Sequence, residues 1–187
     1  MSSSTPSPTT AVRLAQGTAL FLSSVVTGVS FSLSAFLVPR LLESPTPIML
    51  TQLRRTSARA KHTMPFLVLG SAASYLYLSL GSRYFHPHLL TLSQTRAYLA
   101  AAALTLGIVP YTRLVMAGTN GQIAKLEESS GLAAVSLTGK AEVAAEAEVE
   151  AQRERNAKGL VDWWGVLNLG RTGFLMAGAV CGLVATI

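Results

Sequence analysis

The stretch PYTRLVMAGTN, residues 110–120, closes a long apolar segment and carries an unusual number of polar side chains. The segment from Ala97 to Met116 is long enough to cross a membrane, because a spanning helix needs about 20 mostly apolar residues. A helix that only anchored the protein would not need the polar groups gathered at this end, which belong to Tyr111, Thr112, Arg113, Thr119 and Asn120.

The composition of the whole chain is that of an integral membrane protein. Half of the 187 residues are hydrophobic, only 13% are charged, and the mean hydropathy is +0.42, a balance that soluble domains of this size rarely show. The only cysteine, Cys181, lies in an apolar run, which excludes a disulfide framework. The net charge of +6 does not indicate nucleic-acid binding, because no basic-aromatic module accompanies it.

Four apolar segments predict an all-α fold, an integral membrane four-helix bundle. We expect a disordered tail at 1–11 and a single domain over 12–187, with spans at about 14–38, 63–82, 97–117 and 165–187. As the first hydrophobic segment, 14–38 is either a retained span or a cleaved signal, and both interpretations are open.

The segments between the spans are polar. Pro39 is expected to end the first helix, and residues 40–62 to form a basic loop with a short amphipathic helix at 49–61. The segment at about 121–162 is expected to be a polar cytosolic loop that includes a solvated helix or flexible linker.

Basic residues outside the spans predict the orientation. The first and third loops carry five Lys and Arg residues each, whereas the tails and the second loop together carry Arg13, Arg83 and Arg96. The positive-inside rule therefore places the first and third loops in the cytosol. In this topology His62, residues 111–120 and residues 163–171 lie at the same membrane face, where converging helices would form a ligand pocket.

The first span carries a stripe of hydroxyls. Ser23, Thr27, Ser30 and Ser34 have the spacing i, i+4, i+7, i+11, which places them on one helical face. Small residues of this kind favour close packing between helices. The same stripe is also suited to line the expected pocket, and both interpretations are open.

The fourth span carries a second stripe, formed by Trp164, Asn168 and Arg171 at i, i+4, i+7. An arginine within a span is costly unless it is paired or faces a polar cavity, so Arg171 either faces the pocket or snorkels to the headgroups. Trp164 is either a pocket wall or an interfacial belt residue. His62 precedes the second span, where it is either a base or an ordinary interfacial residue.

These residues carry a resemblance to a known family. The run Pro110-Tyr111-Thr112 through Met116 to Thr119-Asn120, followed by Trp164, Leu167-Asn168 and Arg171, resembles the anthrone oxygenase family of small membrane proteins, which occur largely in fungal aromatic polyketide pathways. The likeness extends more loosely to GVSFSLSAFLVP in the first span and to HTMP at 62–65. Gly118 replaces the proline that usually precedes the Thr-Asn pair in that family.

The resemblance implies oxidation of an anthrone-type polyketide to an anthraquinone by molecular oxygen, without flavin, haem or an established metal. It also implies a location in the endoplasmic reticulum or another endomembrane. On this basis His62 is expected to act as the base, Asn168 and Arg171 as oxyanion donors, and Thr119 and Asn120 as positioning donors. Trp164 and Tyr111 would be stacking walls, with Thr112 and Met116 on the same substrate-binding face.

Two other functions remain to be separated from this one by experiment. A non-catalytic membrane protein that binds a hydrophobic ligand or scaffolds a biosynthetic partner would use the same pocket without His62. A metal-dependent oxidase is disfavoured, since the chain has three histidines and the expected topology places His86 and His88 at the opposite face. The oligomeric state is not predicted.

Overall fold

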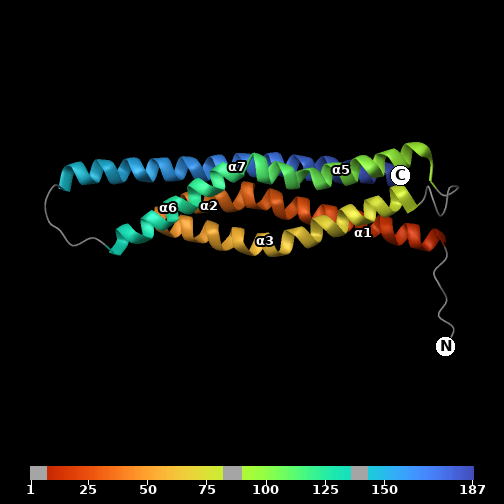
Figure 1. Ribbon diagram of the computed structural model, residues 1–187, viewed down its shortest axis with the longest axis horizontal. Coiled ribbons are helices and arrows are strands. Elements are labelled where there is room, and N and C mark those ends of the chain that lie inside the picture. Colours follow the sequence, from red (N-terminus) through yellow and green to blue (C-terminus); the bar gives the residue numbers. More distant parts are fainter. Residues whose placement is uncertain (1–7, 82–89, 136–142) are drawn as a thin grey trace, which may run out of the picture. The chain divides into compact units, whose positions relative to one another are not determined.

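Every element that the structure describes is a helix. The computed structural model describes residues 8–81, 90–135 and 143–187. In chain order the elements are α1 (Pro8–Ser32), the π-helix η1 (Leu33–Leu37), α2 (Val38–Leu42), α3 (Thr46–Leu76), the π-helix η2 (Tyr77–Gly81), α5 (Leu92–Leu114), α6 (Ala117–Val135) and α7 (Val143–Thr186) (Figure 1). Most of the expected N-terminal tail, together with His86 and His88, lies outside the described residues.

Four helical segments are long and apolar enough to cross a membrane. They are Thr10–Leu42, Thr46–Gly81, Leu92–Leu114 and Glu148–Thr186. The predicted all-α membrane class with four spanning helices is therefore confirmed, and the chain is an integral membrane protein.

The helix expected at 49–61 is confirmed as part of α3, and the described parts of the other expected loop are more helical than predicted. α3 begins at Thr46 and continues without a break past Lys61. Of the polar segment, residues 121–135 belong to α6 and residues 143–162 to α7, while 136–142 lie outside the described residues. The reason is packing: Leu50, Leu53, Ile123 and Val161 from these segments are buried in one apolar core. Burial of an amphipathic face stabilises a helix whatever its distance from the bilayer.

Pro39 does not end the first helix as expected. It occupies the first turn of α2, and the preceding turn, η1, widens to a π-helix in which the Val38 N–H donates to the Leu33 carbonyl. A proline has no N–H for the carbonyl four residues earlier, and its ring crowds that carbonyl. A π-turn relieves the crowding and keeps the helix continuous.

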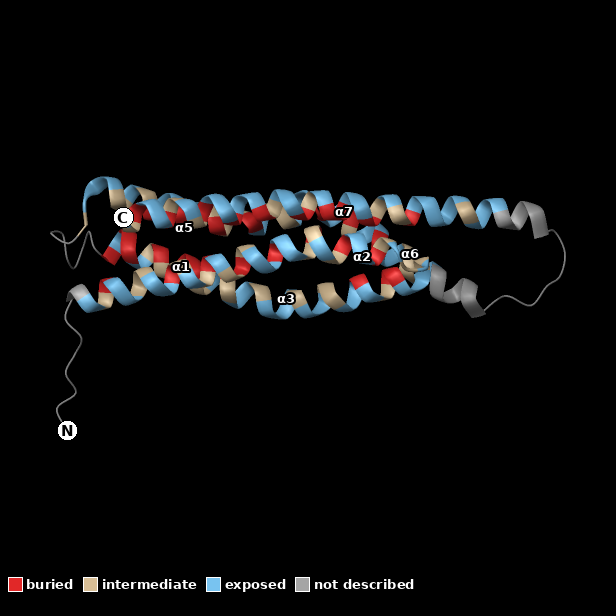
Figure 2. Cartoon of the chain, turned by 180° about the vertical axis from the view of Figure 1, so that it is seen from behind, coloured by how far each residue is buried: buried red, intermediate tan, exposed pale blue. Residues whose placement is uncertain are grey.

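The chain is divided into two compact units. Figure 2 marks the buried residues of the described helices in red. Unit 1 comprises Met1–Ser30, His62–Val109 and Arg171–Ile187, and unit 2 comprises Phe31–Lys61 and Pro110–Gly170. Whether the chain functions as the single domain expected from its sequence stays a prediction.

The core of unit 1 contains polar aromatic residues. Tyr75 and Tyr98 are fully buried and stack with their ring centroids 6.3 Å apart. The Tyr75 hydroxyl lies 2.9 Å from Ser23 Oγ, and the Tyr98 hydroxyl accepts a hydrogen bond from Gln16 Nε2 at 2.9 Å. Buried hydroxyls need such partners, so these bonds connect the first helix to α3 and α5.

Candidate active site

Unit 2 brings the end of the third span against the start of the fourth. The Trp164 indole Nε1–H donates to Asn120 Oδ1 at 3.0 Å, and the Tyr111 hydroxyl donates to the Leu167 carbonyl at 2.9 Å. α5 ends at Leu114, and the turn that follows lets the chain continue into α6, whose first turn carries Asn120. The sequence prediction that these two polar segments are neighbours is confirmed.

The first span contributes a third side to this cluster. Asn168 is fully buried, and its Nδ2 donates to Ser34 Oγ at 2.8 Å. Ser34 Oγ in turn donates to the Gly165 carbonyl at 2.9 Å. Ser34 lies in η1, so the π-turn carries the side chain that holds the Asn168 amide. The residue spacing predicted this serine for the inward face, but nothing in the spacing identified Asn168 as its partner.

Two glycines of α7 allow this close approach. A Cβ on Gly165 would lie 3.1 Å from Val38 Cγ1, which is tighter than ordinary van der Waals contact. A Cβ on Gly170 would overlap the Tyr111 hydroxyl. The glycines thus admit α2 and the Tyr111 side chain to the surface of α7. Sequence reasoning missed both residues, because a glycine in a helix carries no signal of which side chain will pack on it.

The polar contacts are enclosed by apolar packing. Trp164 and Met116 are buried in the core of unit 2, and Tyr111 packs against this core. Thr119 is also buried, and Thr112 is half-buried. The interpretation of Trp164 as an interfacial belt residue does not hold, since only 6% of its surface is exposed, whereas its neighbour Trp163 is 53% exposed.

Arg171 lies in unit 1, where it contacts the same hydroxyl stripe. Its Nε donates to Ser30 Oγ at 3.4 Å, and the buried Thr172 hydroxyl donates to the same oxygen at 2.9 Å. The Arg171 side chain is half-buried. A guanidinium that reaches a buried serine on another helix faces the interior of its unit. That Arg171 faces a substrate pocket stays a prediction.

His62 is not placed within either polar cluster. It lies inside α3 and is exposed, and in the part of the chain that the structure describes it makes no hydrogen bond or ion pair. Its assignment as the base stays a prediction.

The cluster in unit 2 has a defined chemical character. Asn168, Asn120, Trp164 and Ser34 supply amide, indole and hydroxyl groups, which are neutral, in a region from which water is largely excluded. Fixed neutral donors in a dry site stabilise negative charge that develops on an oxygen atom. Among the described residues no group of three or more His, Cys, Asp or Glu side chains is placed to bind a metal ion.

Comparison with known proteins gives one result. The family model described as anthrone oxygenase matches residues 53–181, well over half of the chain. The match includes Tyr111, Asn120, Trp164, Asn168 and Arg171 but begins after Ser34. No curated protein and no solved structure matches the chain.

Proposed function

Because this chain belongs to the anthrone oxygenase family, we propose that it oxidises an anthrone-type aromatic polyketide to the corresponding anthraquinone with molecular oxygen. At the family level the match supports an oxygenase-type enzyme in a membrane. The proposed reaction uses no flavin, haem or metal, and an endomembrane such as the endoplasmic reticulum is the proposed location. The observation that carries the proposal is the family match together with the buried amide and indole groups inside the matched region.

The chemistry needs little from the protein. Removal of a methylene proton from an anthrone gives an aromatic anion, which transfers one electron to oxygen; the resulting radical pair combines to form a peroxide. Loss of the remaining hydrogen at that carbon and cleavage of the O–O bond give the second carbonyl and water. One oxygen atom enters the product and the other leaves as water, so the reaction balances without another reductant.

In this proposal the Asn168 amide donates to the oxyanion of the anthrone, and Ser34 holds the amide in position. Trp164 and Tyr111 supply flat aromatic surfaces, and Asn120 fixes the indole. A donor aimed at a developing oxyanion contributes about 10²–10³ in rate where it has been removed from other enzymes. The roles of His62 as base and Arg171 as a second donor are predictions that substitution must test.

The test is oxygen uptake by the purified full chain in detergent with an anthrone as substrate, followed by quinone absorbance. We expect Asn168→Ala to lower kcat by at least tenfold, and His62→Ala and Arg171→Ala to lower activity as well. Ser24→Ala, at an exposed position on α1, is the matched control. No oxygen uptake by the folded wild-type protein would exclude the oxygenase and leave a protein that binds a hydrophobic ligand without catalysis.

A further inference from the structure

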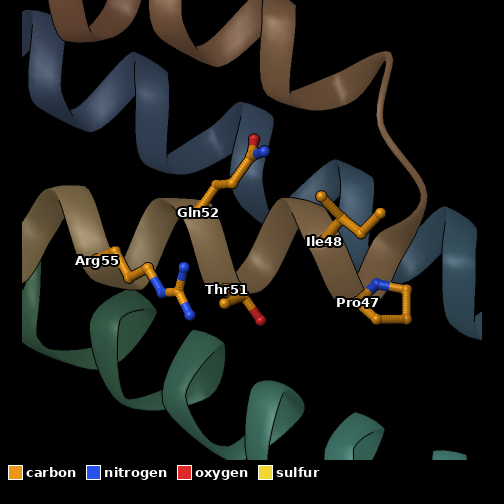
Figure 3. Close-up of a pocket in the computed structure, with 5 residues that line it drawn as sticks. All are labelled: Pro47, Ile48, Thr51, Gln52 and Arg55. Carbon is orange, nitrogen blue, oxygen red and sulfur yellow. The ribbon is translucent and has the colours of Figure 1, made fainter.

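A hollow lies at the start of α3, away from the polar cluster built around Asn168. It has a volume of about 310 Å³ and is lined by Pro47, Ile48, Thr51, Gln52 and Arg55 (Figure 3). This volume is at the lower end of the range for small-molecule sites, which suits a compact group and not a whole lipid or a polycyclic substrate. In Figure 3 Thr51 and Arg55 extend from the same side of α3, toward α6.

The charge in the hollow is not compensated. Arg55 is exposed and, among the described residues, forms no ion pair, whereas its neighbour Arg54 pairs with Glu127 at 2.9 Å. Residues 46–62 contain no Asp or Glu. The nearest element, α6, carries Glu127, which pairs with Arg54, and Glu128. A guanidinium without an ion-pair partner of its own, beside a hydroxyl and an amide donor, is suited to an anion, and arginine matches phosphate oxygens particularly well.

The other end of the hollow is apolar, and the helix residues next to it are anchored in the core of unit 2. Ile48, beside Pro47, is 51% exposed. Met49 and Leu50, which lie between Ile48 and Thr51 in the sequence, are fully buried in the core of unit 2. The segment therefore has one face fixed by packing and an opposite face that is cationic at Arg55 and apolar at Ile48. This combination fits an amphiphile with a negative head.

We propose that this hollow binds the phosphate of an anionic phospholipid. The Arg55 guanidinium and the Thr51 hydroxyl donate to phosphate oxygens, and Ile48 and Pro47 contact the carbon atoms next to the headgroup. α3 enters its charge-free part at Thr63, roughly 12 Å from Arg55 along the helix axis. The headgroup layer and the length of an arginine side chain together span this separation.

The location of the segment favours a lipid over other anions. The loop with the excess of basic residues is expected on the cytosolic side, and the cytosolic leaflet carries anionic lipids. Each Lys or Arg near such a surface increases binding by about fivefold. The interaction does not depend on the oxygenase reaction, so failure of one proposal leaves the other unaffected.

The experiment is native mass spectrometry of the full chain in detergent, with phosphatidic acid, phosphatidylserine or phosphatidylcholine added in turn. We expect more adducts with the two anionic lipids than with phosphatidylcholine. Arg55→Gln should reduce that preference about fivefold, and Arg55→Lys should restore part of it. Arg40→Gln is the matched control, because Arg40 is an exposed arginine of the same unit that pairs with Glu43 outside the hollow.

Two results would overturn the proposal. The first is an Arg55→Gln variant that keeps the full preference for anionic lipid, or an Arg40→Gln variant that loses as much. The second comes from adding inorganic phosphate: if phosphate alone displaces the lipid from the wild-type chain, the hollow is a general anion site. Retention of the lipid in the presence of phosphate supports a site that also recognises the apolar part of the headgroup.

Discussion

Ser34 shows how a single hydroxyl connects segments that are remote in sequence. It accepts from Asn168 and donates to Gly165, so its removal leaves one donor and one acceptor without this partner. Its place on the inward face follows from spacing, since Ser23, Ser30 and Ser34 are all buried. Its partner could not be predicted, because the choice depends on how α1 and α7 pack and not on local sequence.

At the residue scale, Ser34→Ala is expected to lower kcat about five- to tenfold, the cost of roughly 1–1.4 kcal/mol for a lost orienting hydrogen bond. KM should change little, because the serine acts through Asn168 and not on the substrate. Ser34→Thr, which keeps a hydroxyl, should recover part of the rate. The kinetics of quinone formation measure both constants, and a Ser34→Ala enzyme with wild-type kcat would contradict the assignment.

The Trp164–Asn120 hydrogen bond allows a second test. Trp164→Phe keeps an aromatic ring in the core but removes the N–H that donates to Asn120 Oδ1. We expect KM to rise several-fold while the protein stays folded, because the ring that forms the proposed stacking wall is smaller and no longer fixed. Trp163→Phe, at an exposed position, is the control. Equal effects of the two substitutions on KM would show that the indole N–H has no special role.

At the scale of elements, sequence patterns predicted the apolar spans but not the full helices. Hydropathy reports only the part of a helix that faces lipid, so it could not show that α3 begins at Thr46 or that α7 begins at Val143. The parts of these helices outside the apolar spans are stabilised by packing between amphipathic helices, as shown by Leu53 and Ile123, which are buried in the same core. Pro39 was predicted to be a helix end, whereas the chain accommodates it by one π-turn.

The contact between α2 and α7 depends on Gly165. Gly165→Ala places a methyl group against Val38, and we expect a loss of stability of about 1–3 kcal/mol from overpacking. Gly159→Ala is a matched control on the same helix, because nothing lies within 4 Å of a Cβ at that position. Alanine has the higher helix propensity, so the control should be neutral or slightly stabilising. Thermal unfolding in detergent measures both, and a Gly165→Ala protein as stable as the control would refute the close contact.

At the scale of the whole molecule, the distribution of basic residues predicts how the chain is oriented in the membrane. α6 contains Lys125, and the first half of α7 contains Arg153, Arg155 and Lys158. The positive-inside rule predicts that these residues lie in the cytosol. The N-terminal end of α5 is then on the other side. In this predicted orientation the hollow at Arg55 would lie next to the anionic leaflet that the proposed lipid site requires.

Cysteine accessibility tests this orientation. In a Cys181→Ser background, Ser129→Cys on α6 and Ser93→Cys on α5 each place one thiol at an exposed position. In sealed microsomes, whose cytosolic side faces outward, a membrane-impermeant maleimide should label the cysteine at 129 and not the one at 93. Detergent should make both reactive, which shows that each thiol is available. Labelling of position 93 alone in sealed microsomes would show that the orientation is the reverse of the predicted one. Arg55 would then lie at the less anionic leaflet, where charge no longer favours a phospholipid over any other anion.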